Sequence, residues 1–181
     1  MEAACSLLLP QTSLPVIAYG CTSGTVAAGE ARILETLKQL RPGCRPTTPI
    51  TAARAAFDAL KVSRLSVLTP YPRDVHLAVV NHLKGYRLDI VQSAYLGVSE
   101  DLRITEISSD SLEAAVDAVS VDGGDAIFVS CTALRVVTHI ARLERKSGKP
   151  IITSNQALAW HCLRLSGLDV NVQGYGRLFE A

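Results

Sequence analysis

The chain contains the stretch Ala126-Ile-Phe-Val-Ser-Cys-Thr132, four apolar residues followed by Ser-Cys-Thr. A second stretch, Val16-Ile-Ala-Tyr-Gly-Cys-Thr22, repeats this order, with an apolar run, a small residue and then Cys-Thr. Each pattern predicts a short buried strand that ends at a cysteine, just before a helix begins. The free N–H groups and the dipole of such a helix lower the pKa of a thiol. Two such thiols in one chain indicate a paired acid and base.

Apolar runs of this kind alternate with stretches of helical spacing along the whole chain. We expect strands over 15–20, 64–69, 88–96, 126–130 and 150–153. We expect helices over 25–40, 51–61, 74–84, 111–121, 135–147 and 156–166. This alternation predicts an α/β protein with parallel sheets, whose ligands bind at the carboxyl ends of the strands. Ser154 and Asn155, at one strand end, are interpreted as helix caps rather than catalytic residues.

The composition narrows the class of protein and of partner. The 181 residues include 18 basic and 17 acidic side chains, which argues against a nucleic-acid partner. No apolar run reaches the roughly 18 residues that a membrane span needs, and we expect no membrane partner. The five cysteines are odd in number and form no C-x-x-C pair, so we expect free thiols and a cytoplasmic protein.

Several segments together carry a family resemblance. They resemble the maleate cis-trans isomerase and arylmalonate decarboxylase branch of the aspartate/glutamate racemase superfamily, and they cover nearly the whole chain in the right order. The segments are Ala18-Tyr-Gly-Cys-Thr-Ser-Gly-Thr25, Leu68-Thr-Pro-Tyr71, Ser130-Cys-Thr-Ala-Leu-Arg135 and Gly148-Lys-Pro-Ile-Ile-Thr-Ser-Asn-Gln156, with Trp160.

The resemblance implies two pseudo-symmetric parallel-sheet lobes with the active site between them, and no cofactor or metal. Because residues 2–9 look like the end of a helix with no strand before it, we expect the first lobe to lack its first strand. The Pro-rich stretch 41–49 is the candidate crossing between the lobes. The predicted first lobe is 1–45 plus 150–181, and the second is 46–149. An unpaired sheet edge favours a homo-oligomer.

By position, the resemblance also implies the site residues. Cys21 and Cys131 match the two catalytic cysteines of the family. The family's decarboxylases have glycine at the first of these positions, so a chain with both thiols favours isomerase or racemase chemistry. The groups that match those holding a substrate carboxylate are Thr22, Ser23 and Tyr71, with the backbone N–H groups near Cys131 and Thr132.

The residues permit a definite chemistry on a small carboxylate substrate. A Cys21 thiolate can add to the double bond of a cis-unsaturated diacid, while the Cys131 thiol protonates the neighbouring carbon. Rotation about the new single bond and reversal of both steps would release the trans isomer. Two alternatives stay open: a decarboxylase-like enzyme in which Cys131 alone donates a proton, and a non-catalytic fragment that binds small acids.

One departure from the family pattern concerns charge. The family's isomerases tend to have an amide where this chain has Glu100 and Asp101, within Ser99-Glu-Asp-Leu102. A carboxylate that faces the cleft would repel a dicarboxylate, which would argue against maleate as the substrate.

Overall fold

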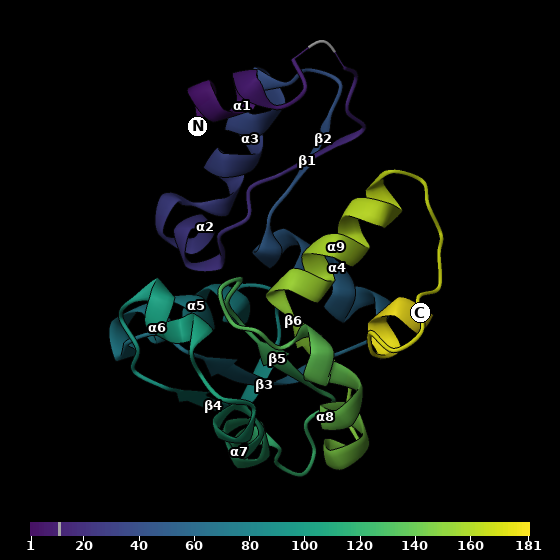
Figure 1. Cartoon of the computed structure of the whole chain (residues 1–181). Coiled ribbons are helices and arrows are strands. Elements are labelled where there is room, and N and C mark those ends of the chain that lie inside the picture. The colour runs from purple at the N-terminus through teal and green to yellow at the C-terminus, as the bar shows by residue number, and fades with distance from the viewer. Residues whose placement is uncertain (11) are drawn as a thin grey trace.

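The computed structural model describes residues 1–10 and 12–181 and contains two parallel sheets (Figure 1). The smaller sheet has two strands, β1 (Val16–Ala18) and β2 (Arg45–Thr47). The larger sheet has the strand order β4-β3-β5-β6, and all of its pairs are parallel. Its strands are β3 (Arg64–Thr69), β4 (Asp89–Tyr95), β5 (Ala126–Val129) and β6 (Ile151–Thr153).

Helices surround both sheets. In Figure 1, α1 and α3 lie with the smaller sheet, α4 and α9 lie between the two sheets, and α7 and α8 lie beyond the larger sheet. The helices are α1 (Glu2–Leu7), α2 (Thr22–Ala28), α3 (Glu30–Leu40), α4 (Pro49–Ala59), α5 (Arg73–Lys84), α6 (Asp101–Thr105), α7 (Ser109–Val119), α8 (Ile140–Ser147) and α9 (Ser154–Leu165), with 3-10 turns at Val137–His139 and Arg177–Glu180.

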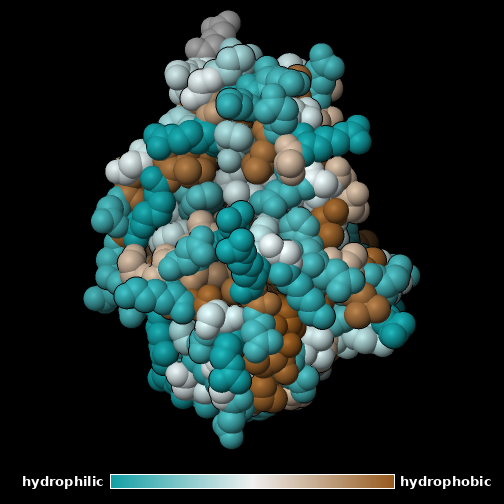
Figure 2. All heavy atoms as spheres, turned by 180° about the vertical axis from the view of Figure 1, so that it is seen from behind, coloured by the Kyte–Doolittle hydropathy of each residue, from teal (hydrophilic) through white to brown (hydrophobic). Residues whose placement is uncertain are grey.

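The two sheets rest on cores of different size. The large core surrounds β3 and β5, where Phe57 and Phe128 meet edge to face with ring centroids 5.5 Å apart. The small core under β1 consists of Cys5, Ile17, Ile33, Leu37 and Cys44. Seen from behind, the surface is largely hydrophilic, and hydrophobic residues gather in a strip over the lower half, where the larger sheet lies in Figure 1 (Figure 2). Among the described residues, no helix is long and apolar enough to cross a membrane.

The predicted α/β class with parallel sheets is confirmed, and several element boundaries are wrong. The single helix expected over 25–40 is two helices, because Gly29 has φ +90° and interrupts the chain between α2 and α3. The Pro-rich stretch contains β2, which its sequence does not reveal. The helix expected from residue 135 begins as a 3-10 turn at Val137 and becomes α-helical only at Ile140.

Two segments of the chain also lie in a different sheet from the one that the predicted lobes assign to them. β6 pairs with β5, so residues 151–153 lie in the larger sheet and not with the first lobe, where the range 150–181 had placed them. β2 pairs with β1, so residues 46–47 lie in the smaller sheet. α9 follows β6 and packs against α4, β1 and β2, and it therefore bridges the two sheets.

Candidate active site

Cys21 lies between the end of β1 and the start of α2. It is the N-cap residue of α2, and its Sγ accepts a hydrogen bond from the N–H of Gly24 at 3.3 Å. The hydroxyl of Ser23 lies 3.8 Å from the same sulfur. Gly24 leaves room for this arrangement, because a Cβ there would come within 2.7 Å of the Tyr19 hydroxyl and 3.0 Å of the sulfur. The thiol is partly exposed and lies beside hydrogen-bond donors.

Cys131 follows β5 in a different local structure. Its φ of +135° is one that residues with a side chain rarely adopt, so this backbone must be held by its surroundings. The side chain is buried, and its Sγ accepts a hydrogen bond from the N–H of Ala133 at 3.3 Å. Its own N–H donates to Ser154 Oγ at 3.0 Å.

Burial raises the pKa of the Cys131 thiol, and the negative charge of Asp101 acts in the same direction. Hydrogen bonds from Tyr71 and from the Ala133 N–H oppose this shift without reversing it. The expectation of a lowered pKa is therefore wrong for Cys131. The physical reason is that no α-helix begins directly after it, so no helix dipole offsets the loss of solvation.

The two Cys-Thr segments lie side by side and are joined by hydrogen bonds. Ser154 Oγ accepts from Thr22 Oγ1 at 2.9 Å as well as from the Cys131 N–H. Thr132 Oγ1 donates to the carbonyl of Gly20 at 3.0 Å, which makes a second link between the strand ends of the two sheets. The structure thus brings the two segments together, as the sequence predicts.

A cavity of about 370 Å³ is lined by Gly24 and Tyr71, which are hydrogen-bonded to Cys21 and Cys131, although neither cysteine is itself a lining residue. Ser23 and Tyr71, two of the predicted carboxylate-binding residues, line it together with Pro72, Ser99 and Asp101. Tyr71 is buried, and burial and the nearby Cys131 raise the pKa of its phenol, so it remains a hydroxyl donor at neutral pH.

The other two predicted binding residues are placed differently. The hydroxyl groups of Thr22 and Thr132 donate to Ser154 and Gly20, as described above, and Thr22 is buried. Both hydroxyl hydrogens are therefore used in hydrogen bonds within the protein. Of the four predicted binding residues, Ser23 and Tyr71 are the ones whose side chains line the cavity.

Sequence reasoning missed the part that Ser154 plays. The cap of α9 is Thr153, which forms a capping box with Gln156, so Ser154 and Asn155 are not the N-cap residues. Ser154 lies at the junction of the two Cys-Thr segments, and Asn155 Nδ2 donates to the carbonyl of Thr132 at 2.9 Å. A hydroxyl residue after a buried strand is a faint signal for such a junction, because its partners are distant in sequence.

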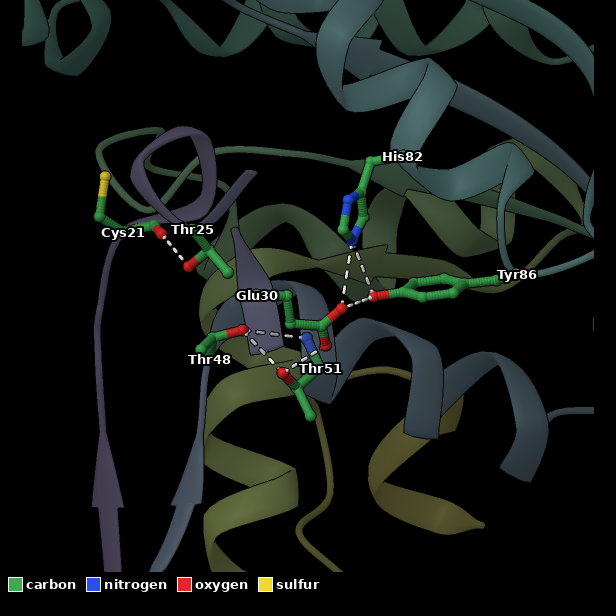
Figure 3. A network of polar contacts seen from close by, with 7 residues as sticks. All are labelled: Cys21, Thr25, Glu30, Thr48, Thr51, His82 and Tyr86. Atoms are coloured by element: carbon green, nitrogen blue, oxygen red, sulfur yellow. Dashed lines mark hydrogen bonds and ion pairs between the residues drawn. The ribbon is translucent and has the colours of Figure 1, made fainter. Parts of the chain in front are cut away.

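A second polar cluster anchors the helices that follow Cys21 (Figure 3). Glu30, the first residue of α3, accepts a hydrogen bond from Thr51 Oγ1 at 2.7 Å and another from the Tyr86 hydroxyl. His82 Nε2 lies 3.2 Å from the same carboxylate. Although burial alone would raise the pKa of Glu30, hydrogen bonds from these groups lower it to about 2. The charged carboxylate thus ties α3 to α4 and α5.

Within residues 1–10 and 12–181, no group of three or more His, Cys, Asp or Glu side chains is arranged to hold a metal ion. The polar groups gathered at the strand ends include hydroxyls and backbone N–H groups, which can donate hydrogen bonds to a carboxylate.

Known enzymes are similar to this chain in sequence. The chain is 24% identical to maleate isomerase of Pseudomonas putida, over 97% of this chain and 74% of the relative. It is 29% identical to arylmalonate decarboxylase of Bordetella bronchiseptica, over 74% of this chain and 57% of the relative.

Solved structures match along nearly the whole chain. A mutant of Nocardia farcinica maleate cis-trans isomerase with a covalently bound succinylcysteine intermediate superposes with a TM-score of 0.91 at 22% identity, covering 98% of this chain and 76% of that one. A liganded mutant of arylmalonate decarboxylase gives a TM-score of 0.92 at 25% identity, covering 99% and 78%. The sequence profile of arylmalonate decarboxylase matches residues 26–179. The chain belongs to the arylmalonate decarboxylase family.

Proposed function

We propose that the protein is a cofactor-independent isomerase or racemase that acts on a small carboxylic or dicarboxylic acid through Cys21 and Cys131. The observation that carries the proposal is the pairing of unlike thiols at joined strand ends. Cys21 is partly exposed and accepts an N–H hydrogen bond, whereas Cys131 is buried with a raised pKa. A nucleophile and an acid need such unlike surroundings, because one must react as the thiolate and the other must carry the proton.

The isomerase reaction would begin with the Cys21 thiolate. Its sulfur forms a bond to one carbon of a cis double bond, and the π electrons move toward the neighbouring carbon and its carboxylate. Cys131 gives its S–H proton to that neighbouring carbon and becomes a thiolate. After rotation about the carbon–carbon single bond, Cys131 removes a proton again, the C–S bond breaks, and the trans isomer leaves. Succinylcysteine, seen in the Nocardia relative, is the product of adding a thiol across the double bond of maleate.

The substrate carboxylate would be held by the hydroxyls of Ser23 and Tyr71, which line the cavity. Negative charge grows on this carboxylate when the carbon beside it is protonated or deprotonated, and prearranged donors stabilise it by a few kcal/mol each. Thr22 and Thr132 would act through their backbone N–H groups while their hydroxyls fix the two strand ends.

A second function is favoured by one specific observation. Cys131 has the environment of a proton donor by itself, and the relative with 29% identity is an arylmalonate decarboxylase. In that reaction the substrate loses CO₂, and the resulting carbanion takes the proton of Cys131. A protein that only binds small acids is the third candidate. Each of the three candidate functions is compatible with a cytoplasmic protein whose thiols are reduced. That the protein forms a homo-oligomer stays a prediction.

The proposal is tested with a panel of small mono- and diacids in deuterated water, followed by NMR. We expect isomerisation or exchange of a carbon-bound proton with at least one acid, and we expect Cys21→Ser and Cys131→Ser each to abolish isomerisation. Cys162→Ser is the matched control, because Cys162 is a half-buried free thiol on α9 that does not line the cavity. Decarboxylation that survives Cys21→Ser would instead identify the second function, and turnover that survives both substitutions would refute a role for the thiols.

A further inference from the structure

The cavity that Gly24 and Tyr71 connect to the two thiols has an unusual charge for a site that receives an acid. Its lining contains the hydroxyls of Ser23, Tyr71 and Ser99, the apolar side chains of Val75 and Val98, and the carboxylate of Asp101. Among the described residues that line it, Asp101 is the charged one, and none is a lysine, arginine or histidine. The hydroxyls can bind one carboxylate of a substrate. A second carboxylate would find no cationic side chain among the described lining residues.

The position of Asp101 is set by the short helix α6, which begins at this residue directly after Glu100. The two neighbouring carboxylates have different surroundings. Glu100 lines an adjoining hollow of about 590 Å³, together with Arg103 and Ser108, and this hollow shares Val98 and Ser99 with the cavity. Asp101 lines the cavity with Ser23 and Tyr71, and its charge is close enough to Cys131 to raise the pKa of that thiol. Its field therefore acts on the place where the substrate would react.

We propose that Asp101 sets the substrate class of this site: an acid with a single carboxylate and, toward Asp101, a hydrogen-bond donor such as an amide or hydroxyl, in preference to a dicarboxylate. The inference rests on the proposed cysteine site and narrows its substrate. The carboxylate would lie against Ser23 and Tyr71, and the donor would meet the Asp101 oxygens.

Electrostatics give the direction and the size of this preference. A second carboxylate near Asp101 is repelled, whereas an amide N–H or a hydroxyl in the same place donates to it. Asp101 is exposed, so water and salt weaken both effects. A preference of about tenfold is what one like-charge contact of this kind supports at low ionic strength.

Maleate and its monoamide are suitable probes, because they differ only in the group that would face Asp101. Dissociation constants are measured by calorimetry for both probes with the full chain, with Asp101→Asn and with Glu100→Gln as the matched control. Both substitutions remove one negative charge from neighbouring residues, but only the first is in the cavity. The same titrations in Cys21→Ser report on binding without turnover.

We expect the unmodified protein to bind the monoamide about tenfold more tightly than maleate, and we expect high salt to narrow the ratio. Asp101→Asn should bring the ratio close to one, while Glu100→Gln leaves it unchanged. Equal binding of the two probes by the unmodified protein, or a ratio that Asp101→Asn does not move, would overturn the inference. A preference that persists in Cys21→Ser without any turnover by the unmodified protein would uphold the role of Asp101 and count against the proposed catalysis alone.

Discussion

The strand ends at Cys21 and Cys131 have similar sequences and different environments. Cys21 has an extended backbone, caps a helix and is partly exposed, whereas Cys131 has a φ of +135° and is buried. Cys21 is not part of the small core of five buried residues, whereas Cys131 is itself part of the large core around the four-stranded sheet. The comparison shows that a repeated local pattern placed both thiols at strand ends, while burial by the rest of the fold made them chemically unlike.

The largest expected effect comes from crowding the Cys21 end. In Gly24→Ala, the new Cβ would lie 2.7 Å from the Tyr19 hydroxyl and 3.0 Å from Cys21 Sγ, so the hydroxyl must move away and the sulfur must shift with it. We expect kcat/KM to fall about 10- to 100-fold, because the cost of misplacing a nucleophile reaches about 100-fold for a shift of roughly 1 Å. Gly20→Ala is the control, since a Cβ there meets nothing within 4 Å. Equal activity of the two variants would mean that the position of Cys21 is not critical.

The second prediction concerns Ser154, whose hydroxyl oxygen accepts the hydrogen bond of the Cys131 N–H. Ser154→Ala removes the acceptor of the buried Cys131 N–H and of the Thr22 hydroxyl. We expect the free energy of unfolding to drop by about 2–3 kcal/mol, as for other buried groups left without partners. Activity should fall more than tenfold because the φ of Cys131 loses a restraint. Urea denaturation and steady-state kinetics check this, with Ser166→Ala, at the end of α9, as the control. A variant as stable as the parent would show that the backbone at Cys131 is held by other contacts.

The Cys21 side has its own anchor in the Glu30 cluster, whose contribution depends on pH. The pKa of Glu30 is about 2 in the folded protein against an ordinary value of 4.5, so its stabilisation is present above about pH 4.5 and is lost as the pH falls toward 2. We expect Glu30→Gln to lower the free energy of unfolding at pH 7 by about 1–3 kcal/mol. The gap to the parent protein should shrink in urea titrations at pH 4 and pH 3.

Glu35→Gln is the matched control for this titration. Glu35 lies on α3, and its Oε1 accepts a hydrogen bond from Gln39 at an exposed position. The free energy of unfolding of the Glu35→Gln variant should stay within about 0.5 kcal/mol of the parent value at every pH. A gap for Glu30→Gln that stays constant from pH 7 to pH 3 would contradict the lowered pKa.

The smallest expected effect is a shift in the pH at which the Cys131 thiol reacts with an alkylating reagent. Because burial raises the pKa of Cys131, alkylation of this thiol by iodoacetamide should require a higher pH than that of an ordinary thiol. Tyr71→Phe removes a hydrogen bond that lowers this pKa, so the alkylation profile of Cys131 should move to still higher pH. Peptide mapping by mass spectrometry distinguishes alkylation of Cys131 from alkylation of the other four cysteines. A profile that moves to lower pH in Tyr71→Phe would contradict the described contact.

The sequence predicted the elements whose signal is local. β3 and β5 lie where continuous apolar, β-branched runs predict buried strands, and the thiols follow β1 and β5 as expected. β2 was missed because Arg45-Pro-Thr47 has no apolar run and its pairing with β1 is a tertiary contact. The bend between α2 and α3 depends on a single glycine within an otherwise helical pattern.

The site was predictable only in part, for a related reason. Ser23 and Tyr71 were identified at strand ends, and the structure places both along one cavity. Ser154 acts on residues that are 132 and 23 positions away, and no periodicity in the chain encodes such pairs. The protonation of Cys131 depends on how much of the fold covers it, which a local pattern cannot state.

The hydrogen bonds between the two strand ends also bear on how fast a ligand can enter and leave. Separating the sheets at this point would break the contact of Thr22 with Ser154 and that of Thr132 with Gly20, whereas the bond from the Cys131 N–H to Ser154 would stay within the larger lobe. Two such bonds contribute about 1–3 kcal/mol together. Opening at this point must also break the Glu30 hydrogen bonds and the packing of α9 on β1 and β2, so ligand exchange through an opened form is slower than these two bonds alone would allow.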